Sequence, residues 1–143
     1  MSTNKILFGA LAGGIVYFLL GWLIYGTLLA DFANAYPELK PESVTDITRS
    51  PMVYWAMFVG CLVYGLLLAV IFGRWASIST FITGAKAGAV ITLLMALAFD
   101  LMMYSMLKTM TLNGALIDPL ISGVMGAITG GVVGWVLGYG NKK

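Results

Sequence analysis

The stretch that decides the fold is residues 118–138, DPLISGVMGAITGGVVGWVLG, near the C-terminal end of the chain. Every fourth residue along it is small: Ser122, Gly126, Gly130, Gly134 and Gly138. In a water-exposed helix each glycine costs about 1 kcal/mol relative to alanine. In lipid, by contrast, helices associate through close packing of small residues. The pattern therefore predicts a transmembrane helix that packs against another helix through this strip of small residues.

The composition agrees with a chain that lies in a membrane. Hydrophobic residues make up 60% of the 143 residues and charged residues 10%, whereas soluble domains carry roughly 25% charge. The length suffices for four spans of about 20 residues each. We expect one all-α domain, a four-helix transmembrane bundle, with spans at about 4–30, 51–73, 81–107 and 119–139 and an outer loop at 31–50.

Local signals suggest where the spans begin. Ser50-Pro51 and Asp118-Pro119 each have the form of an N-cap followed by proline at the first helical position. Asn113-Gly114 predicts a turn just before the last span. For the first span a signal peptide is the alternative, since residues 33–35 have the A-x-A form of a cleavage site. The apolar run is longer than a signal peptide needs, so we expect a retained helix.

Small residues recur in the other expected spans. We predict that one set of glycines packs helix against helix, namely Gly9, Gly13, Gly65, Gly84, Gly88, Gly126, Gly130, Gly134 and Gly138. One arrangement occurs twice along the chain. A span that begins with small residues is followed by a cap-proline pair and then by a span with small residues at four-residue spacing. This order indicates either two pseudo-repeated helical hairpins or only the self-similarity of apolar sequence.

Asp100 is the most informative ionisable residue. It is expected inside the third span, where a charged group costs at least about 2–3 kcal/mol unless it is paired, protonated or facing water. It continues the ridge of Gly84 and Gly88, so it is predicted to face other helices. One hypothesis is a proton or cation site. The other is a structural hydrogen bond, or an ion pair with Arg49 or Lys108.

Two further acids are expected on the same side of the membrane as Asp100. Asp118 is interpreted first as the N-cap of the last helix, and Asp31 ends the first span. Both are candidates for the outer mouth of an ion or proton pathway that uses Asp100. Tyr17 and Tyr64 lie mid-span, where their hydroxyl groups need partners such as Asp100 or Thr92. Tyr25 is expected in the aromatic belt at the interface.

The usual catalytic and metal-binding machinery is missing from the sequence. It has no histidine, a single cysteine (Cys61) and no nucleophile elbow or phosphate-binding loop. We therefore expect a protein that is not an enzyme and has no cofactor. Met102, Met106 and Met110 follow at four-residue spacing and are weak candidates for Cu(I), although methionine is also common core filler. The net charge of +2 is too small to suggest nucleic acid.

The layout also carries a resemblance. A glycine-rich first helix with Gly21-Trp22-Leu23-Ile24-Tyr25-Gly26, a polar outer loop and three further spans resembles the small four-helix bacterial integral membrane proteins of unknown function. The resemblance implies a bacterial cytoplasmic-membrane protein and brings no activity with it. Basic residues near the span ends favour cytoplasmic termini, with Lys5, Arg74, Lys142 and Lys143 on one side.

Two functional hypotheses follow from these patterns. The first is a non-catalytic accessory or assembly subunit, or a homo-oligomer, that packs through glycine ridges against its own helices and those of a partner. The second is a small cation or proton pathway that uses Asp100. Intramembrane hydrolysis would need two acids within hydrogen-bond reach across helices. Membrane lipid is the surrounding partner in each case.

Overall fold

The structure is a computed structural model that describes residues 1–31, 51, 53–107 and 111–140. Helix α1 (Thr3–Leu23) continues through the π-helical turn η1 (Ile24–Leu28), and α3 (Tyr54–Val70) continues through a second π-helical turn, η4 (Ile71–Trp75). Helices α4 (Phe81–Met106) and α5 (Leu112–Gly138) follow. Four helical segments are long and apolar enough to cross a membrane. The predicted all-α, four-helix transmembrane bundle is confirmed for the described residues, and most of the expected outer loop, 32–50, lies outside them.

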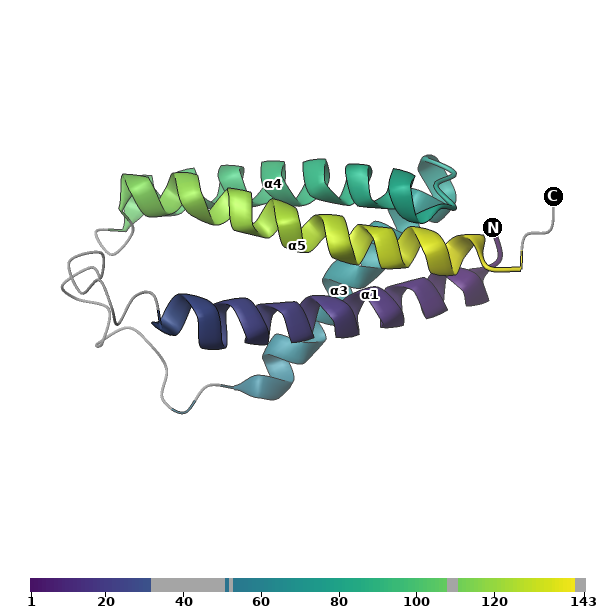
Figure 1. The fold of residues 1–143 in the computed structure, drawn as a ribbon, viewed down its shortest axis with the longest axis horizontal. Helices are drawn as coiled ribbons and strands as arrows, with labels where there is room; N and C mark the ends of the chain where they lie inside the picture. Colours follow the sequence, from purple (N-terminus) through teal and green to yellow (C-terminus); the bar gives the residue numbers. More distant parts are fainter. Residues whose placement is uncertain (32–50, 52, 108–110, 141–143) are drawn as a thin grey trace.

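The helices form two pairs, and the contact between α1 and α5 is the most extensive one between them. Helices α4 and α5 run antiparallel and side by side, whereas α3 crosses α1 steeply (Figure 1). Helix α1 also packs along α5, and this contact joins the two pairs. The start of α1, the end of α5 and the connection at residues 76–80 lie at the same end of the bundle (Figure 1). We call it the terminal end, and the other the loop end.

Helices α4 and α5 meet backbone to backbone. A Cβ atom added at Gly130 would lie 2.8 Å from Gly88 Cα, and one added at Gly134 would lie 3.1 Å from Gly84 Cα. Real Cβ atoms avoid the shorter distance, so only glycine permits this approach. At the loop-side end of the strip Gly126 meets the side chain of Thr92. The strip at four-residue spacing on α5 therefore faces α4 within the same chain.

A second close contact joins α1 to α3. A Cβ at Gly14 would lie 2.7 Å from Leu62 Cα, and a Cβ at Gly65 would lie 2.5 Å from the backbone nitrogen of Gly14. Gly13 instead faces α5, where an added Cβ would meet Val133 Cγ2 at 2.5 Å. The glycines of α1 thus bring it against two helices at once.

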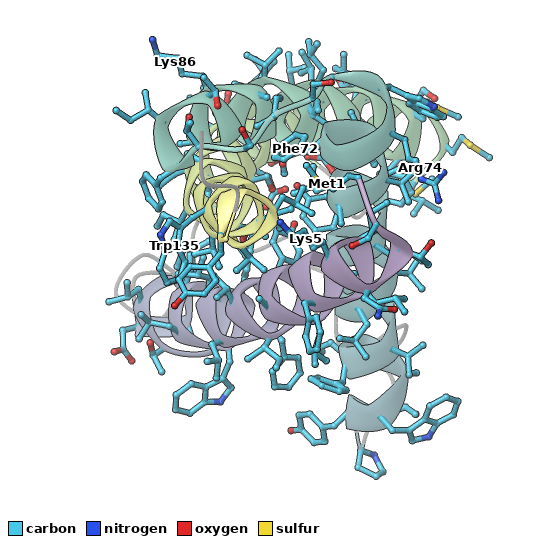
Figure 2. All side chains as sticks on the ribbon, turned by 90° about the vertical axis from the view of Figure 1, so that its right-hand side faces the viewer. Met1, Lys5, Phe72, Arg74, Lys86 and Trp135 are labelled. Carbon is cyan, nitrogen blue, oxygen red and sulfur yellow. The ribbon has the colours of Figure 1, made fainter. Side chains whose placement is uncertain are left out.

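The hydrophobic core lies where α1, α3 and α5 meet. It is made of seven buried residues: Ile6, Ala10, Leu68, Ala69, Phe72, Val133 and Leu137. Phe72 belongs to η4, and its ring is fully buried between the helices near the terminal end (Figure 2). Helix α5 contributes more buried residues than any other helix. It is the central helix of the bundle.

The predicted starts of the second and fourth helices are wrong. Helix α5 begins seven residues before Pro119, because the Thr111 hydroxyl caps it by accepting a hydrogen bond from the Gly114 backbone nitrogen at 3.1 Å. Asn113-Gly114 therefore lies in the first helical turn, and Pro119 is inside the helix. Residues 112–117, which are mostly apolar, extend the helix. Buried proline is tolerated where neighbouring helices pack around it.

At the second span, Pro51 precedes the helix instead of occupying its first position. Helix α3 starts at Tyr54, and its N-cap residue Val53 makes no side-chain capping bond. Ser50 lies outside the described residues. The two expected cap-proline pairs therefore do not mark equivalent points of two repeated hairpins, and the hairpins themselves cross at visibly different angles (Figure 1).

Replacing Gly130 with alanine tests the contact between α4 and α5. The added methyl group would meet the backbone of Gly84 and Gly88, so the helices must separate. We expect a loss of about 1–3 kcal/mol in unfolding free energy, as for other overpacked sites. Gly21→Ala is the matched control, since its methyl group would meet only Met125 Cε at 3.8 Å. Thermal unfolding in mild detergent measures both variants, and equal midpoints would contradict the contact.

Candidate functional site

Asp100 lies in the loop-end half of α4, on the face that packs against α5. Its side chain is buried, with 6% of its surface exposed, and its Oδ2 atom has no hydrogen-bond partner among the described residues. Buried carboxyl oxygens are normally paired, because removing an unpaired charge from water is expensive. Asp100 therefore needs a proton, a cation or water beside it.

Asp118 is the residue that faces Asp100. The antiparallel arrangement brings the late part of α4 against the early part of α5, and the two carboxyl groups are close enough to interact electrostatically. Asp118 is half-buried. Its Oδ1 atom accepts a hydrogen bond from the Tyr25 hydroxyl at 2.6 Å, and its Oδ2 accepts one from the Ser122 hydroxyl at 3.4 Å. We call Asp100, Asp118, Tyr25 and Ser122 the acid-pair site.

The donors in this site are unevenly distributed. Asp118 receives a hydroxyl donor on each oxygen, whereas Asp100 has an oxygen with none. Both oxygens of Asp118 thus act as hydrogen-bond acceptors, while the Oδ2 atom of Asp100 is buried without a donor. Asp118 is not an N-cap, contrary to the sequence-based interpretation, because the helix already starts at Leu112.

The π-helical turn η1 positions Tyr25. In this turn the Thr27 hydroxyl donates to the carbonyl of Leu23, and Tyr25 reaches across to α5. A π-helical turn inserts an extra residue into the helical repeat, so the side chains after it point in new directions. Such turns are frequent at functional sites. Here the turn links the end of the first span to the acid pair.

Cationic side chains of the described residues are far from the acid pair. Lys5, Arg74 and Lys86 belong to the terminal half of the bundle, whereas Asp100 and Asp118 lie toward the loop end (Figures 1 and 2). The predicted alternative partners Arg49 and Lys108 lie outside the described residues. Two neighbouring carboxylates in a low-dielectric environment repel each other, which favours binding of a proton or cation between them.

A second polar contact lies farther along the same face of α4. The hydroxyl groups of Tyr64 and Thr92 are hydrogen-bonded to each other, and Thr92 also donates to the Gly88 carbonyl at 2.7 Å. The ring of Tyr17 lies against that of Tyr64, with centroids 4.3 Å apart. The prediction that a mid-span tyrosine bonds to Thr92 is confirmed for Tyr64. This contact joins α3 to α4 deep in the bundle.

The remaining candidates do not join this site. Asp31 is exposed at the end of the first span, and no described hydrogen bond connects it to Asp100 or Asp118. Met102 and Met106 are exposed on α4, at 60% and 72%, and Met110 lies outside the described residues. Within the described ranges, no group of three histidine, cysteine or acidic side chains is arranged to hold a metal ion.

The hydrogen bonds of Tyr25 and Ser122 to Asp118 were not predicted from the sequence. Tyr25 was expected only in the interfacial belt, and Ser122 only as a member of the small strip. A signal was nevertheless present, because Ser122 follows Asp118 by four residues and a helix places such pairs on one face. No comparable signal existed for Tyr25, whose position depends on the π-helical turn.

Comparisons with known proteins give no further information about this site. No protein-family model, curated protein or solved structure matches the chain. The geometry of the described residues is therefore the basis for the function proposed below.

Tyr25→Phe removes the donor to Asp118 and leaves the ring in place. A hydrogen bond to a charged group contributes about 1.5–3 kcal/mol, so we expect a lower unfolding midpoint if Asp118 is ionised. Tyr104→Phe is the control, because Tyr104 is exposed on α4 toward the same end and has no such bond. Thermal unfolding in detergent compares the two. Equal midpoints would show that the bond to Asp118 contributes no stability.

Proposed function

We propose that this multi-pass membrane protein binds and passes a proton or a small cation at the acid pair, Asp100 and Asp118. The observation that carries the proposal is the unpartnered, buried Oδ2 of Asp100 beside a second carboxyl group. Ionisable groups inside membrane spans are expensive and typically mark ion or proton routes. The role is non-catalytic, as the absence of a histidine base or a nucleophile elbow in the sequence suggested.

The side chains of the two acids differ in how far they are exposed at the surface of the bundle. Asp118 is half-buried and contacts the partly exposed Tyr25, whereas Asp100 is nearly fully enclosed. A proton arriving at the loop end therefore reaches Asp118 first. It then moves from the Asp118 carboxyl group to the Asp100 carboxylate, which leaves Asp118 ionised and hydrogen-bonded to Tyr25 and Ser122. Net charge of the pair is unchanged by this step.

The route beyond Asp100 leads toward Thr92 and Tyr64. Thr92 lies eight residues earlier on α4, about 12 Å along the helix axis at 1.5 Å per residue. Direct transfer cannot cover that distance, so the proposed route requires water between the acid pair and the Tyr64–Thr92 contact. A bound cation, in contrast, needs only the carboxyl oxygens and the hydroxyl groups of the acid-pair site.

A bacterial cytoplasmic membrane is the proposed location, with both termini in the cytoplasm. The layout resemblance supports the bacterial membrane. The orientation is supported by Lys5, Arg74 and Lys86, which all belong to the terminal half of the bundle, because basic residues are enriched on the cytoplasmic side. The acid pair would then lie toward the outer leaflet.

The second candidate is an accessory subunit or homo-oligomer. The glycine contacts between α4 and α5 have the form of a glycine zipper, but they are occupied within the chain. One small-residue pair is still uncovered, since Ala56 and Gly60 are exposed on α3 and a Cβ at Gly60 would meet nothing within 4 Å. This half of α3 projects away from α4 and α5 (Figure 1). A helix of a partner or a second copy fits there.

Asp100→Asn in proteoliposomes tests the proposed pathway. The substitution keeps the shape of the side chain and removes its charge, so proton or cation flux driven by a pH gradient or voltage should fall to the level of empty liposomes. Asp31→Asn is the control, because Asp31 is an exposed acid at the loop end and should leave flux unchanged. Flux that is absent from the wild type, or equal in the two variants, would contradict the pathway.

Gly60→Leu tests the second candidate separately. If the Ala56–Gly60 surface binds a helix, the bulky side chain should remove a copurifying partner or convert an oligomer to a monomer, as measured by mass and size in gentle detergent. Unchanged assembly would exclude this surface as the contact. Since Gly60 lies on α3 and Asp100 on α4, the two tests report on different hypotheses.

A further inference from the structure

Thr129 is a polar residue in the interior of the bundle. Its side chain is fully buried, and its Oγ1 atom has no hydrogen-bond partner among the described residues. Within the described ranges, the only other buried side-chain atom of this kind is Oδ2 of Asp100. Buried hydroxyl groups normally bond to protein or to ordered water. Thr129 lies eleven residues after Asp118, about 16 Å along the helix at 1.5 Å per residue, so it is separate from the acid-pair site.

Packing against α1 holds the hydroxyl group of Thr129 in place. A Cβ atom added at Gly13 would lie 3.6 Å from Thr129 Cγ2 and 3.5 Å from Gly65 Cα, so α1, α3 and α5 meet at this point. A threonine hydroxyl group in a helix commonly bonds to a carbonyl of its own helix. The methyl and hydroxyl groups share one Cβ atom and turn together. Turning the hydroxyl group toward such a carbonyl would therefore move the methyl group out of its contact with α1.

Tyr64 brings a second hydroxyl group to this crossing. It is hydrogen-bonded to Thr92, which touches α5 at Gly126, three residues before Thr129. Thr92 donates its only hydroxyl hydrogen to the Gly88 carbonyl at 2.7 Å, so Tyr64 is the donor in the bond between the two hydroxyl groups. A hydroxyl oxygen can also accept hydrogen bonds. The described hydrogen bonds leave this acceptor position of Tyr64 unfilled.

We propose that Thr129 and Tyr64 bind one internal water molecule where the helices cross. The Thr129 hydroxyl group donates to the water oxygen, and the water donates one hydrogen to the Tyr64 oxygen. This arrangement satisfies both hydroxyl groups, and helix carbonyl oxygens nearby have second lone pairs for the other water hydrogen. Globular proteins hold about one buried water per 27 residues, with two to four hydrogen bonds each.

The water molecule links two helices that have little direct contact. Helix α3 touches α5 much less than it touches α1, so a polar link from Tyr64 to Thr129 adds a connection between the two helix pairs. The buried core of Phe72, Val133 and Leu137 lies on the terminal side of Thr129. Water therefore reaches the site from the loop side. Binding of this water does not require transport at the acid pair.

Nuclear magnetic resonance of the full-length protein in detergent micelles tests the site. Threonine and leucine methyl groups are labelled with carbon-13, and magnetisation transfer from water to each methyl group is recorded. The Thr129 methyl group should give a cross-peak with water although the residue is fully buried. Leu137 is the matched control, because it is equally buried two turns farther along α5 and has no hydroxyl group. Its methyl groups should give none, whereas exposed Thr111 should give one.

Two tyrosine variants show whether the second partner is correct. Tyr64→Phe removes the acceptor of the water, so the Thr129 cross-peak should be lost although the two side chains have no direct bond. Tyr17→Phe is the control, because its ring lies against Tyr64 with centroids 4.3 Å apart and its hydroxyl group is not part of the site. It should keep the cross-peak. A wild type in which Thr111 but not Thr129 contacts water, or equal effects of the two variants, would overturn the proposal.

Discussion

The direct contact between the backbones of α4 and α5 is the constraint on which the rest of the structure depends. Gly88 lies against Gly126 and Gly130, and Gly84 lies against Gly130 and Gly134. This contact fixes the register of the two antiparallel helices. Moving twelve residues from Gly88 along α4 reaches Asp100, and moving twelve residues back from Gly130 along α5 reaches Asp118. The packing of glycines therefore brings the two acids together.

The position of α5 explains why two distinct polar features lie along one small bundle. One face of α5 is covered by α4, and another face is covered by α1 through Gly13 and the core residues Val133 and Leu137. Toward the loop end, the acid pair lies between α4 and α5, with Tyr25 reaching it from η1. Nearer the terminal end, α1 and α3 enclose Thr129 of α5 at the proposed water site.

Structural features that depend on local sequence were predicted correctly. The apolar runs predicted four membrane-spanning helices, and the four-residue spacing from Ser122 to Gly138 predicted a strip for helix contact. The start of α5 was missed because two capping signals compete there, and the sequence does not show that Thr111 is used instead of Asp118. Asp118 was interpreted first as an N-cap, so the wrong start also obscured its position inside the helix beside Asp100.

Only part of the acid-pair site could be predicted from the sequence. Asp100 was identified because an acid in an apolar span is unusual, and facing acids were considered only as a condition for hydrolysis. Pairing with Asp118 depends on the register of two helices, and the contribution of Tyr25 depends on a π-helical turn with no clear sequence signal. Both are properties of tertiary packing, which one sequence does not specify residue by residue.

A disulfide cross-link between Leu93→Cys and Gly123→Cys, made in a Cys61→Ser background, tests the α4–α5 register most directly. A Cβ at Gly123 would lie 3.3 Å from Leu93 Cβ, close to the 3.5–4.5 Å or so that separates the Cβ atoms of a disulfide. The control pair uses Leu94→Cys, since Leu94 is exposed on α4. The account predicts rapid cross-linking within one chain for the first pair and little for the control. Cross-links mainly between chains, or equal rates for both pairs, would contradict it.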